Sequence, residues 1–377
     1  MTPNGLSVRR LVLGALGVAL ATLAAGCNLE EIALDRLNVD ASVSVDMSAP
    51  DARETITSDI PFSGQRLVVD NPIGQIAIET VEDPGYVAVR PTIHVEATKS
   101  VKGMDLDQLR IQTEQTADET RIRVTTAIPT VRNTPEQARR SGEPIGWVDF
   151  KIRLPQAAVV TLHQSAGSIV VDTFRGELTA TTELGNIDVR NATTSALSLR
   201  SKLGTLSVAQ STVDGDLSLE TSAGVIQVSN VRFNRAEADT QAGEVSVQNV
   251  RGQGLDVSTQ FGEIDVAEAE LSQLDLASQM GEIHLQDSRI ATGTLSTQWG
   301  EITVQVRPDA VPRIRAETQA GAVDVYRLPE TLRASLHRRG SWLGESLELA
   351  PSDAQGTLDL ATQLGDVQIV FPRATSP

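Results

Sequence analysis

A glycine recurs about every 19 residues through the second half of the chain, and a short alternation of aliphatic side chains follows it. The motif reads Gly-x-Ile/Val/Leu-x-Val/Ile/Leu, as in Gly262-Glu263-Ile264-Asp265-Val266. The glycines are, in chain order, Gly167, Gly185, Gly204, Gly224, Gly243, Gly262, Gly281, Gly300, Gly321 and Gly365. Their successive spacings are 18, 19, 20, 19, 19, 19, 19, 21 and 44 residues. A fixed period of this kind indicates a repeat protein, in which each unit packs on its neighbours.

Each unit also contains an apolar alternation before its glycine, such as Leu255-Asp256-Val257 ahead of Ile264-Asp265-Val266. Alternation with period two predicts strands with one buried face. Two short strands per unit leave no room for a helix of ordinary length. We therefore predict an all-β protein with a parallel β-solenoid over residues 159–372, its two-strand rungs about 4.8 Å apart. The 44-residue spacing is expected to hold two rungs, one of which has lost its glycine.

Two polar columns precede the glycine. Three residues before it stand Thr182, Ser201, Thr221, Thr240, Thr259, Ser278, Thr297, Thr318 and Thr362. The next position holds Gln241, Gln260, Gln279, Gln298, Gln319 and Gln363. In a parallel stack we expect these columns to form hydroxyl and amide ladders that satisfy one another. The glycine is expected to supply a corner with positive φ or close backbone approach.

The composition of the chain excludes one class of function and limits what the core can contain. The chain has 49 acidic and 32 basic side chains and a formal net charge of −17, whereas a nucleic-acid-binding surface is normally basic. We therefore expect no nucleic-acid partner. Hydrophobic residues make up 40% of the chain but aromatic residues only 3%, so the core must be built mainly from Ile, Val, Leu and Ala.

The first 26 residues have the pattern of a signal peptide: Arg9 and Arg10, an apolar stretch, then small residues before Cys27, the chain's single cysteine. Leu23 to Cys27 resembles the lipobox of bacterial lipoproteins. The resemblance implies cleavage before Cys27, lipid on its sulfur and an extracytoplasmic place in the cell envelope, at the outer membrane if the cell has one. Loss of the two arginines would leave a net charge of −19. An ordinary secretory signal with an incidental cysteine is the alternative.

The rest of the chain divides by pattern. Residues 27–60 are polar and are expected to form a flexible tether, and residues 373–377 a short tail. Residues 61–158 are expected to form a β-rich N-terminal region, with a polar loop at 129–146. The strand-like runs in that region cover residues 86–96, 110–112, 120–126 and 148–154.

One candidate binding patch stands immediately before three successive glycines. Phe261, Met280 and Trp299 occupy this position and would stack into a short apolar stripe. Aromatic stripes bind glycans or anchor protein interfaces. Packing at the corner is the competing interpretation, because the same column elsewhere holds Ala and Leu.

A second candidate follows the glycine. The residues of this column that form an acidic ladder are Glu244, Glu263, Glu282 and Glu301, with Asp265 and His284 two places further along. These side chains would point outward, with Glu263, Asp265, Glu282 and His284 forming a compact quartet on two rungs. Stacked carboxylates repel and must be solvated, paired or bridged by a cation.

A solvated acidic face is the expected state of this ladder. We expect no cofactor, and Ca²⁺ is the cation to test at these oxygens, although it needs six to eight ligands. Zinc needs several close nitrogen or sulfur donors, and His94, His163, His284 and His337 lie on separated segments. Carboxylates about 5 Å apart also suit a retaining glycosidase, but short turns provide no cleft to raise the pKa of a catalytic acid.

Three motifs resemble the bacterial putative-adhesin family of β-strand-repeat proteins. They are Asn71-Pro72-Ile73-Gly74-Gln75-Ile76, Val148-Asp149-Phe150-Lys151-Ile152-Arg153-Leu154-Pro155, and Val160-Thr161-Leu162 with Gly167-Ser168-Ile169-Val170-Val171. The resemblance covers about residues 60–372 and implies an extracytoplasmic β-solenoid. It transfers no catalytic residue.

These observations predict a non-enzymatic, lipid-anchored envelope protein that presents a solenoid surface for adhesion or for binding a protein or glycan. A self-associating envelope scaffold is an alternative, because open solenoid ends carry unpaired strand edges. A carbohydrate-active enzyme on a β-helix is a second alternative.

Overall fold

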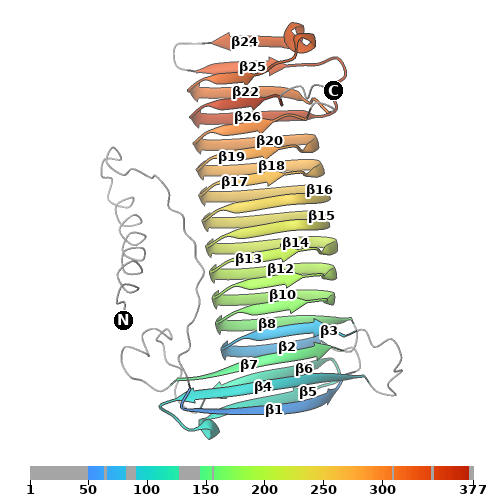
Figure 1. Ribbon diagram of the computed structural model, residues 1–377, viewed down its shortest axis with the longest axis vertical. Coiled ribbons are helices and arrows are strands. Elements are labelled where there is room, and N and C mark those ends of the chain that lie inside the picture. Colours follow the sequence, from blue (N-terminus) through green and yellow to red (C-terminus); the bar gives the residue numbers. More distant parts are fainter. Residues whose placement is uncertain are drawn as a thin grey trace. The chain divides into compact units, whose positions relative to one another are not determined.

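The computed structural model describes residues 50–62, 66–81, 91–126, 145–154, 157–307, 310–340 and 344–372. The chain divides into two units, Met1–Val39 and Asp40–Pro377, and every described residue belongs to the second. The strands described in that unit join one sheet and stack as successive rungs (Figure 1). The predicted all-β, solenoid-like fold is confirmed.

Each repeat contributes a long strand before its glycine and a four-residue strand after it. The long strands are β8 (Ala158–Ala166), β10 (Arg175–Leu184), β12 (Thr193–Leu203), β14 (Thr212–Ala223), β18 (Glu270–Met280), β20 (Arg289–Trp299), β22 (Arg313–Ala320) and β26 (Thr357–Leu364). The short strands are β9 (Ile169–Asp172), β11 (Ile187–Arg190), β13 (Leu206–Ala209), β17 (Ile264–Ala267), β19 (Ile283–Gln286), β21 (Ile302–Gln305), β23 (Val323–Tyr326) and β27 (Val367–Val370). Two longer strands, β15 (Ile226–Ala242) and β16 (Val245–Phe261), combine a short strand with the next long one. The two strands expected per rung are confirmed, and the strand before the glycine is longer than predicted.

Parallel pairing between equivalent positions builds the core. Leu276 pairs with Leu295 on the next rung, and Ile283 pairs with Ile302. All four side chains are buried, as the period-two alternation predicts. Because each rung repeats this arrangement, the interior is a narrow column of aliphatic side chains.

The glycine forms a corner that no other residue fits. Gly281 has a φ of +157°, and a Cβ there would lie 1.9 Å from the carbonyl oxygen of Gly262 on the neighbouring rung. Left-handed backbone and close approach therefore coincide at this position. A second left-handed corner was not predicted, since its residue types vary: it comprises Thr173, Asn191, Gln210, Asn230, Asn249, Glu268, Asp287 and Arg327.

The solenoid begins earlier in the chain than predicted. Strands β2 (Arg66–Ile73) and β3 (Ile76–Thr80) flank Gly74 and pair in parallel with β8 and β9. They form the first rung, so the predicted start at residue 159 was wrong. The error arose because a long insertion separates this rung from the second in the sequence.

That insertion packs at the N-terminal end of the stack. Its strands are β4 (Thr92–Lys102), β5 (Leu109–Gln115), β6 (Glu119–Thr126) and β7 (Ile145–Leu154), with a 3₁₀ turn η2 (Leu106–Gln108). Antiparallel ladders join β4 to β7 and β5 to β6, while β6 and β7 continue the stack in parallel beside β2 and β3. Most of the predicted loop at 129–146 lies outside the described residues; its last two residues begin β7.

The expected tether was wrong over its last part. Strand β1 (Ala52–Pro61) pairs antiparallel with β4 over its whole length. Most of its side chains are exposed, so the sequence carries no hydrophobic alternation there, and the backbone ladder holds the strand. The earlier part of the tether, the signal segment, Cys27 and the C-terminal tail lie outside the described residues.

The C-terminal rung is inserted out of chain order. Strand β26 pairs in parallel with β20 on one side and β22 on the other, and β27 lies likewise between β21 and β23. We call β26 and β27 the inserted rung. The residues between β23 and β26 form a 3₁₀ segment η3 (Glu330–Ser335) and an antiparallel pair, β24 (Leu336–Gly340) and β25 (Glu345–Leu349), stacked on β22. The 44-residue spacing therefore holds a cap, and the expectation of two rungs there was wrong.

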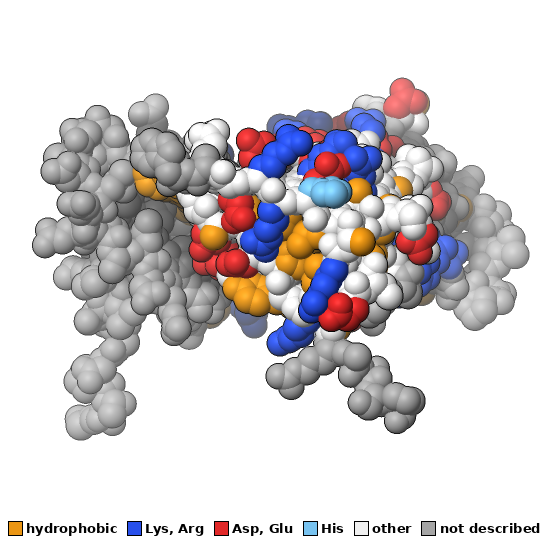
Figure 2. Space-filling view, turned by 90° about the horizontal axis from the view of Figure 1, so that it is seen from above, with side chains coloured by type: hydrophobic (Ala, Val, Ile, Leu, Met, Phe, Trp, Pro, Cys, Tyr) orange, Lys and Arg blue, Asp and Glu red, His pale blue; other side chains and the backbone are white. Residues whose placement is uncertain are grey.

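Both ends of the stack are covered by these antiparallel strands. Seen from above in Figure 2, Lys, Arg, Asp and Glu side chains surround a small apolar centre at the β24 end. Arg338 and Arg339 are exposed on β24 itself. Charged side chains on an edge strand oppose pairing with further strands. Among the described residues, no helix is long and apolar enough to cross a membrane.

Candidate functional site

The glycine corner organises the outward surface of each rung. On the rung of β18 and β19, Ala277 and Gln279 point outward before Gly281, and Glu282 and His284 point outward after it. Parallel pairing repeats these positions in register on the neighbouring rungs. Each outward position thus becomes a column along the stack, and the candidate sites are sets of neighbouring columns.

A groove of about 900 Å³ follows the column four residues before the glycine. We call it the flank groove. Its floor is made of small side chains at successive rungs: Ser258, Ala277, Ser296 and Ala361. The same column holds Asp239 and Glu220 at one end and Glu317 at the other. Small residues between longer ones create the groove, which spans seven rungs or roughly 30 Å.

The glutamine column lines the flank groove. Gln260, Gln279, Gln298 and Gln363 contribute exposed side chains to it, and the described residues show no hydrogen bond between these glutamines. The predicted self-satisfying amide ladder is therefore wrong. Its carboxamides point into the groove, where they can donate and accept hydrogen bonds with a ligand.

The threonine column is buried behind the glutamines. Some of its hydroxyls donate across rungs to glycine carbonyls: Thr297 Oγ1 lies 3.2 Å from the Gly281 oxygen, and Thr362 Oγ1 lies 3.1 Å from that of Gly300. Ser201, Ser278 and Thr318 make the same bond. The buried hydroxyls of this column that have no hydrogen-bond partner among the described residues are those of Thr182, Thr221, Thr240 and Thr259. The prediction that the hydroxyl and amide ladders satisfy one another was wrong, because the hydroxyls that find a partner here use the glycine carbonyls at the corner. These bonds fix the corner that carries the outward columns.

The apolar stripe lies between the glutamine column and the glycine. Phe261 is 38% exposed and Trp299 is 49% exposed, with half-buried Met280 paired between them. Because β26 is inserted beside β20, Leu364 follows Trp299 in the stripe and is also exposed. Of the two interpretations, this exposure favours a binding patch over core packing.

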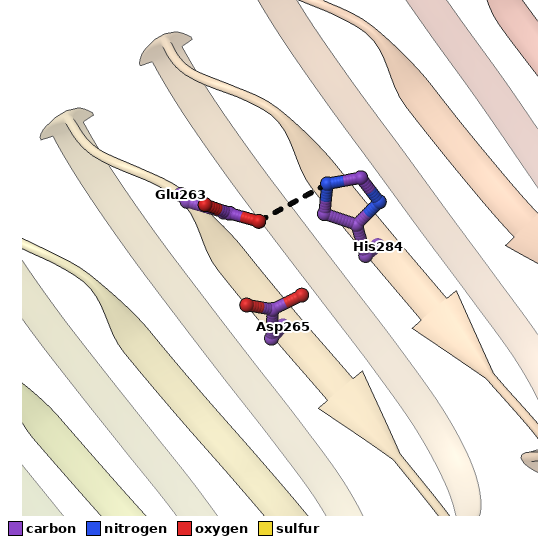
Figure 3. A group of neighbouring side chains, drawn as sticks. All are labelled: Glu263, Asp265 and His284. Carbon is purple, nitrogen blue, oxygen red and sulfur yellow. Dashed lines mark ion pairs between the residues drawn. The ribbon is translucent and has the colours of Figure 1, made fainter. Parts of the chain in front are cut away.

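The acidic ladder lies on the other side of the corner. In Figure 3, Glu263 and His284 point toward each other and Asp265 stands beside them, with His284 Nε2 3.1 Å from Glu263 Oε1. The same nitrogen lies 3.3 Å from Glu282 Oε2. Ligand atoms of Glu263, Asp265 and His284 all lie within 4.8 Å of one another. The structure thus brings together the quartet that the repeat period predicts.

The quartet is partly shielded from solvent. Burial raises the pKa of Glu263, and the charge of Asp265 raises it further, against the lowering effect of His284. Burial is also the largest cause of the raised pKa of Asp265. The outer members of the ladder differ, because Glu244 has Ser246 beside it and Glu301 accepts a hydrogen bond of 2.9 Å from Thr303.

A second group of acids stands two residues before the groove floor. Glu237, Asp256 and Asp275 are in register on adjacent strands. The charge of Asp239 is the largest cause of the raised pKa of Glu237. Burial, followed by the charge of Asp275, raises the pKa of Asp256. The surface along the flank groove is therefore crowded with negative charge.

The inserted rung supplies further members of these columns, of which Gln363 was predicted from the sequence, while Ala361 and Asp366 were not. Ala361 completes the groove floor, Gln363 the glutamine wall and Leu364 the stripe. Asp366 extends the acidic ladder beyond Glu301, and its Oδ1 accepts a hydrogen bond of 2.8 Å from the Ala322 amide. The sequence feature that indicates the inserted rung is the 44-residue spacing, because the order of the rungs in space differs there from their order in the chain.

A family model matches residues 177–370, just over half of the chain, and its description is Toastrack DUF4097. This chain belongs to the Toastrack DUF4097 family. The matched segment contains the flank groove, the apolar stripe and the acidic ladder. The first rung, around Gly74, lies outside the matched segment.

Solved structures with weak similarity span most of the chain. A putative cell adhesion protein from Clostridium sporogenes is 10% identical, covers 85% of this chain and 100% of its own, and has a TM-score of 0.19. A putative adhesin from Bacteroides fragilis is 14% identical over 85% of this chain and 97% of its own, with a TM-score of 0.29. A putative lipid binding protein from Parabacteroides distasonis is 11% identical over 86% and 98%, with a TM-score of 0.34. No curated protein matches the chain.

Proposed function

We propose that this protein is a non-catalytic cell-envelope protein that binds an extended glycan without acidic groups along the flank groove. The observation that carries the proposal is the groove itself, a continuous channel of about 900 Å³ walled by glutamine side chains. Its length suits several sugar rings in line. Glutamine amides and serine hydroxyls offer both donors and acceptors to sugar hydroxyls.

The apolar stripe adds a second kind of contact. Trp299 and Phe261 expose aromatic surface directly beside the glutamine wall. The apolar faces of sugar rings pack on such surface. The acids at the ends of the groove and the net charge of −17 would repel an anionic polymer, which is why the proposed ligand lacks acidic groups.

A place in the envelope is the second part of the proposal. It is supported by the signal pattern of residues 1–26 and by the small residues before Cys27. Anchoring through lipid on Cys27 would leave the solenoid free to present its flank. Mass spectrometry of the N-terminal peptide from membranes tests this part: a diacylglyceryl mass on Cys27 is expected, and an unmodified thiol would contradict it.

A binding role fits the geometry better than catalysis or polymerisation. The paired carboxylates of the acidic ladder stand on short turns around an open corner, and they line neither the flank groove nor the second groove beside Arg235 and Gln253. The antiparallel strands over both ends of the stack oppose end-to-end assembly.

A glycan array probed with the whole chain in detergent tests the proposal. We expect binding to neutral or amine-bearing linear glycans, and a loss of roughly tenfold or more in affinity for Trp299→Ala. Leu203→Ala is the matched control, because Leu203 is an exposed apolar residue in the same column, one rung beyond the groove. Binding to basic proteins alone, or equal effects of the two substitutions, would overturn the proposal.

A further inference from the structure

We propose that Glu263, Asp265 and His284, with Glu282 beside them, form a binding site for a divalent transition-metal ion of the zinc class. The site lies on β17, β19 and the corners that precede them, on the opposite side of the glycine from the flank groove. It is independent of glycan binding.

The donor atoms already have the spacing of a coordination sphere. Zinc binds nitrogen and carboxylate oxygen at about 2.0–2.2 Å in a tetrahedral arrangement, which places neighbouring ligand atoms about 3.4 Å apart. His284 Nε2 lies 3.1 Å from Glu263 Oε1 and 3.3 Å from Glu282 Oε2. Asp265 offers an oxygen within 4.8 Å of the Glu263 and His284 ligand atoms, a gap that rotation of an outward side chain closes.

One nitrogen can make a full hydrogen bond to only one of its two close carboxylates at a time. Nε2 carries at most one hydrogen, yet it faces oxygens from Glu263 and Glu282 on successive rungs. A metal ion between them would accept the nitrogen lone pair and both carboxylates at once. The His284 side chain is only 21% exposed, so its position is held by the rungs.

The arrangement is confined to two rungs of the ladder. Asp265 pairs in register with His284, whereas the equivalent positions on the adjacent rungs are Ser246 and Thr303. Among the described ion pairs, Glu263 and Glu282 both have His284 as their partner, and no Lys or Arg pairs with either. A divalent ion would neutralise this concentration of negative charge.

The donor types favour a transition metal over calcium. Carboxylate oxygens are also zinc ligands, so the several nitrogen or sulfur donors that the sequence argument required are not necessary. Imidazole nitrogen with carboxylate oxygen suits zinc and its first-row neighbours, while calcium prefers six to eight oxygens. The His284 ring therefore distinguishes this site from an unspecific acidic face. The ion would bridge two rungs through side chains alone and leave positions open to solvent.

Zinc titration of the whole chain, stripped with chelator and kept in detergent, tests the site by calorimetry. We expect one zinc per chain with a raised melting temperature, and a loss of roughly tenfold or more in affinity for His284→Ala. His163→Ala is the matched control, because His163 is exposed on β8 far along the stack. Cys27 is present in every variant, so any binding by its sulfur is a constant background.

A second, nearly isosteric variant separates binding from folding. Asp265→Asn should also weaken zinc binding while circular dichroism shows an unchanged β-sheet signal. Absence of zinc binding above background, equal binding by the His284 and His163 variants, or calcium binding that survives His284→Ala would each overturn the proposal.

Discussion

At the scale of the residue, the glycine corner is the strictest requirement of this fold. A Cβ at Gly281 would meet a backbone oxygen at 1.9 Å, and that oxygen is held by the stack. We expect Gly281→Ala to lower the free energy of unfolding by an amount on the order of 3 kcal/mol, measured by chemical denaturation. Gly340→Ala is the control, since nothing lies within 4 Å of a Cβ there, and its change should stay within about 0.5 kcal/mol. Equal losses would contradict the close-approach argument.

Crowded carboxylates give a residue-scale prediction about pH. The charge of Asp239 raises the pKa of Glu237. Burial and then the charge of Asp275 raise the pKa of Asp256, against the lowering effect of Arg235. A carboxyl with a raised pKa holds its proton more tightly in the folded state, so stability increases as pH falls toward the ordinary pKa values of 4.5 and 3.8. We expect Glu237→Gln with Asp256→Asn to raise the melting temperature at pH 7 by roughly 1–3 °C, and less at pH 5.

The control for the comparison between pH 7 and pH 5 removes a negative charge far from Glu237 and Asp256. Glu114→Gln takes one negative charge from β5, an exposed strand of the N-terminal region. It should leave the difference in melting temperature between pH 7 and pH 5 as it is in the unaltered chain. A double variant with the same pH response as the unaltered chain would show that mutual repulsion in this column is unimportant.

Counting positions from each glycine explains which site residues could be predicted from the sequence. The parallel stack has one residue column per sequence offset from the glycine, so Glu263, Asp265 and His284 were predictable neighbours. The exposure of Trp299 was not predictable, because Ala and Leu occupy the same column elsewhere and the corner geometry decides which side is open. The groove floor was missed because small residues carry no pattern of their own.

At the scale of the element, the inserted rung is the feature that chain order conceals. Gly300, Gly365 and Gly321 occupy one column of the stack. The rungs of β26 and β22 have the same glycine corner, so either could pack next to β20. Sequence periodicity therefore could not decide which rung follows β21. Strand β1 was missed for a different reason, since a largely exposed strand lacks the alternation that indicates one.

Cross-linking tests the inserted rung. Ser296 pairs with Ala361, and Ala361 pairs with Glu317. Ser296→Cys with Ala361→Cys should form a disulfide, because neighbouring strands lie about 4.8 Å apart. Ser296→Cys with Glu317→Cys should not, because β26 separates them by about twice that distance. Peptide mapping by mass spectrometry identifies the linked pair, and the reverse result would show that the rungs stack in chain order.

At the scale of the whole molecule, one repeated corner generates two different surfaces. The columns before the glycine make a polar groove with an apolar stripe beside it, and the columns after it make an acidic ladder. The same in-register stacking that buries Ile, Val and Leu thus extends any outward side chain into a linear array. A linear array suits a linear ligand, which is the physical basis of the proposed function.

The most direct test of this account is to fill the flank groove from its floor. Ala277→Phe places a large side chain among the small ones, while Thr181→Phe places the same side chain in the same column on β10, outside the groove. Calorimetry with the best glycan from the array should show that Ala277→Phe weakens binding by roughly tenfold or more and Thr181→Phe does not, with both variants folded. Unchanged binding by the Ala277 variant would contradict the proposal that the groove is the binding site.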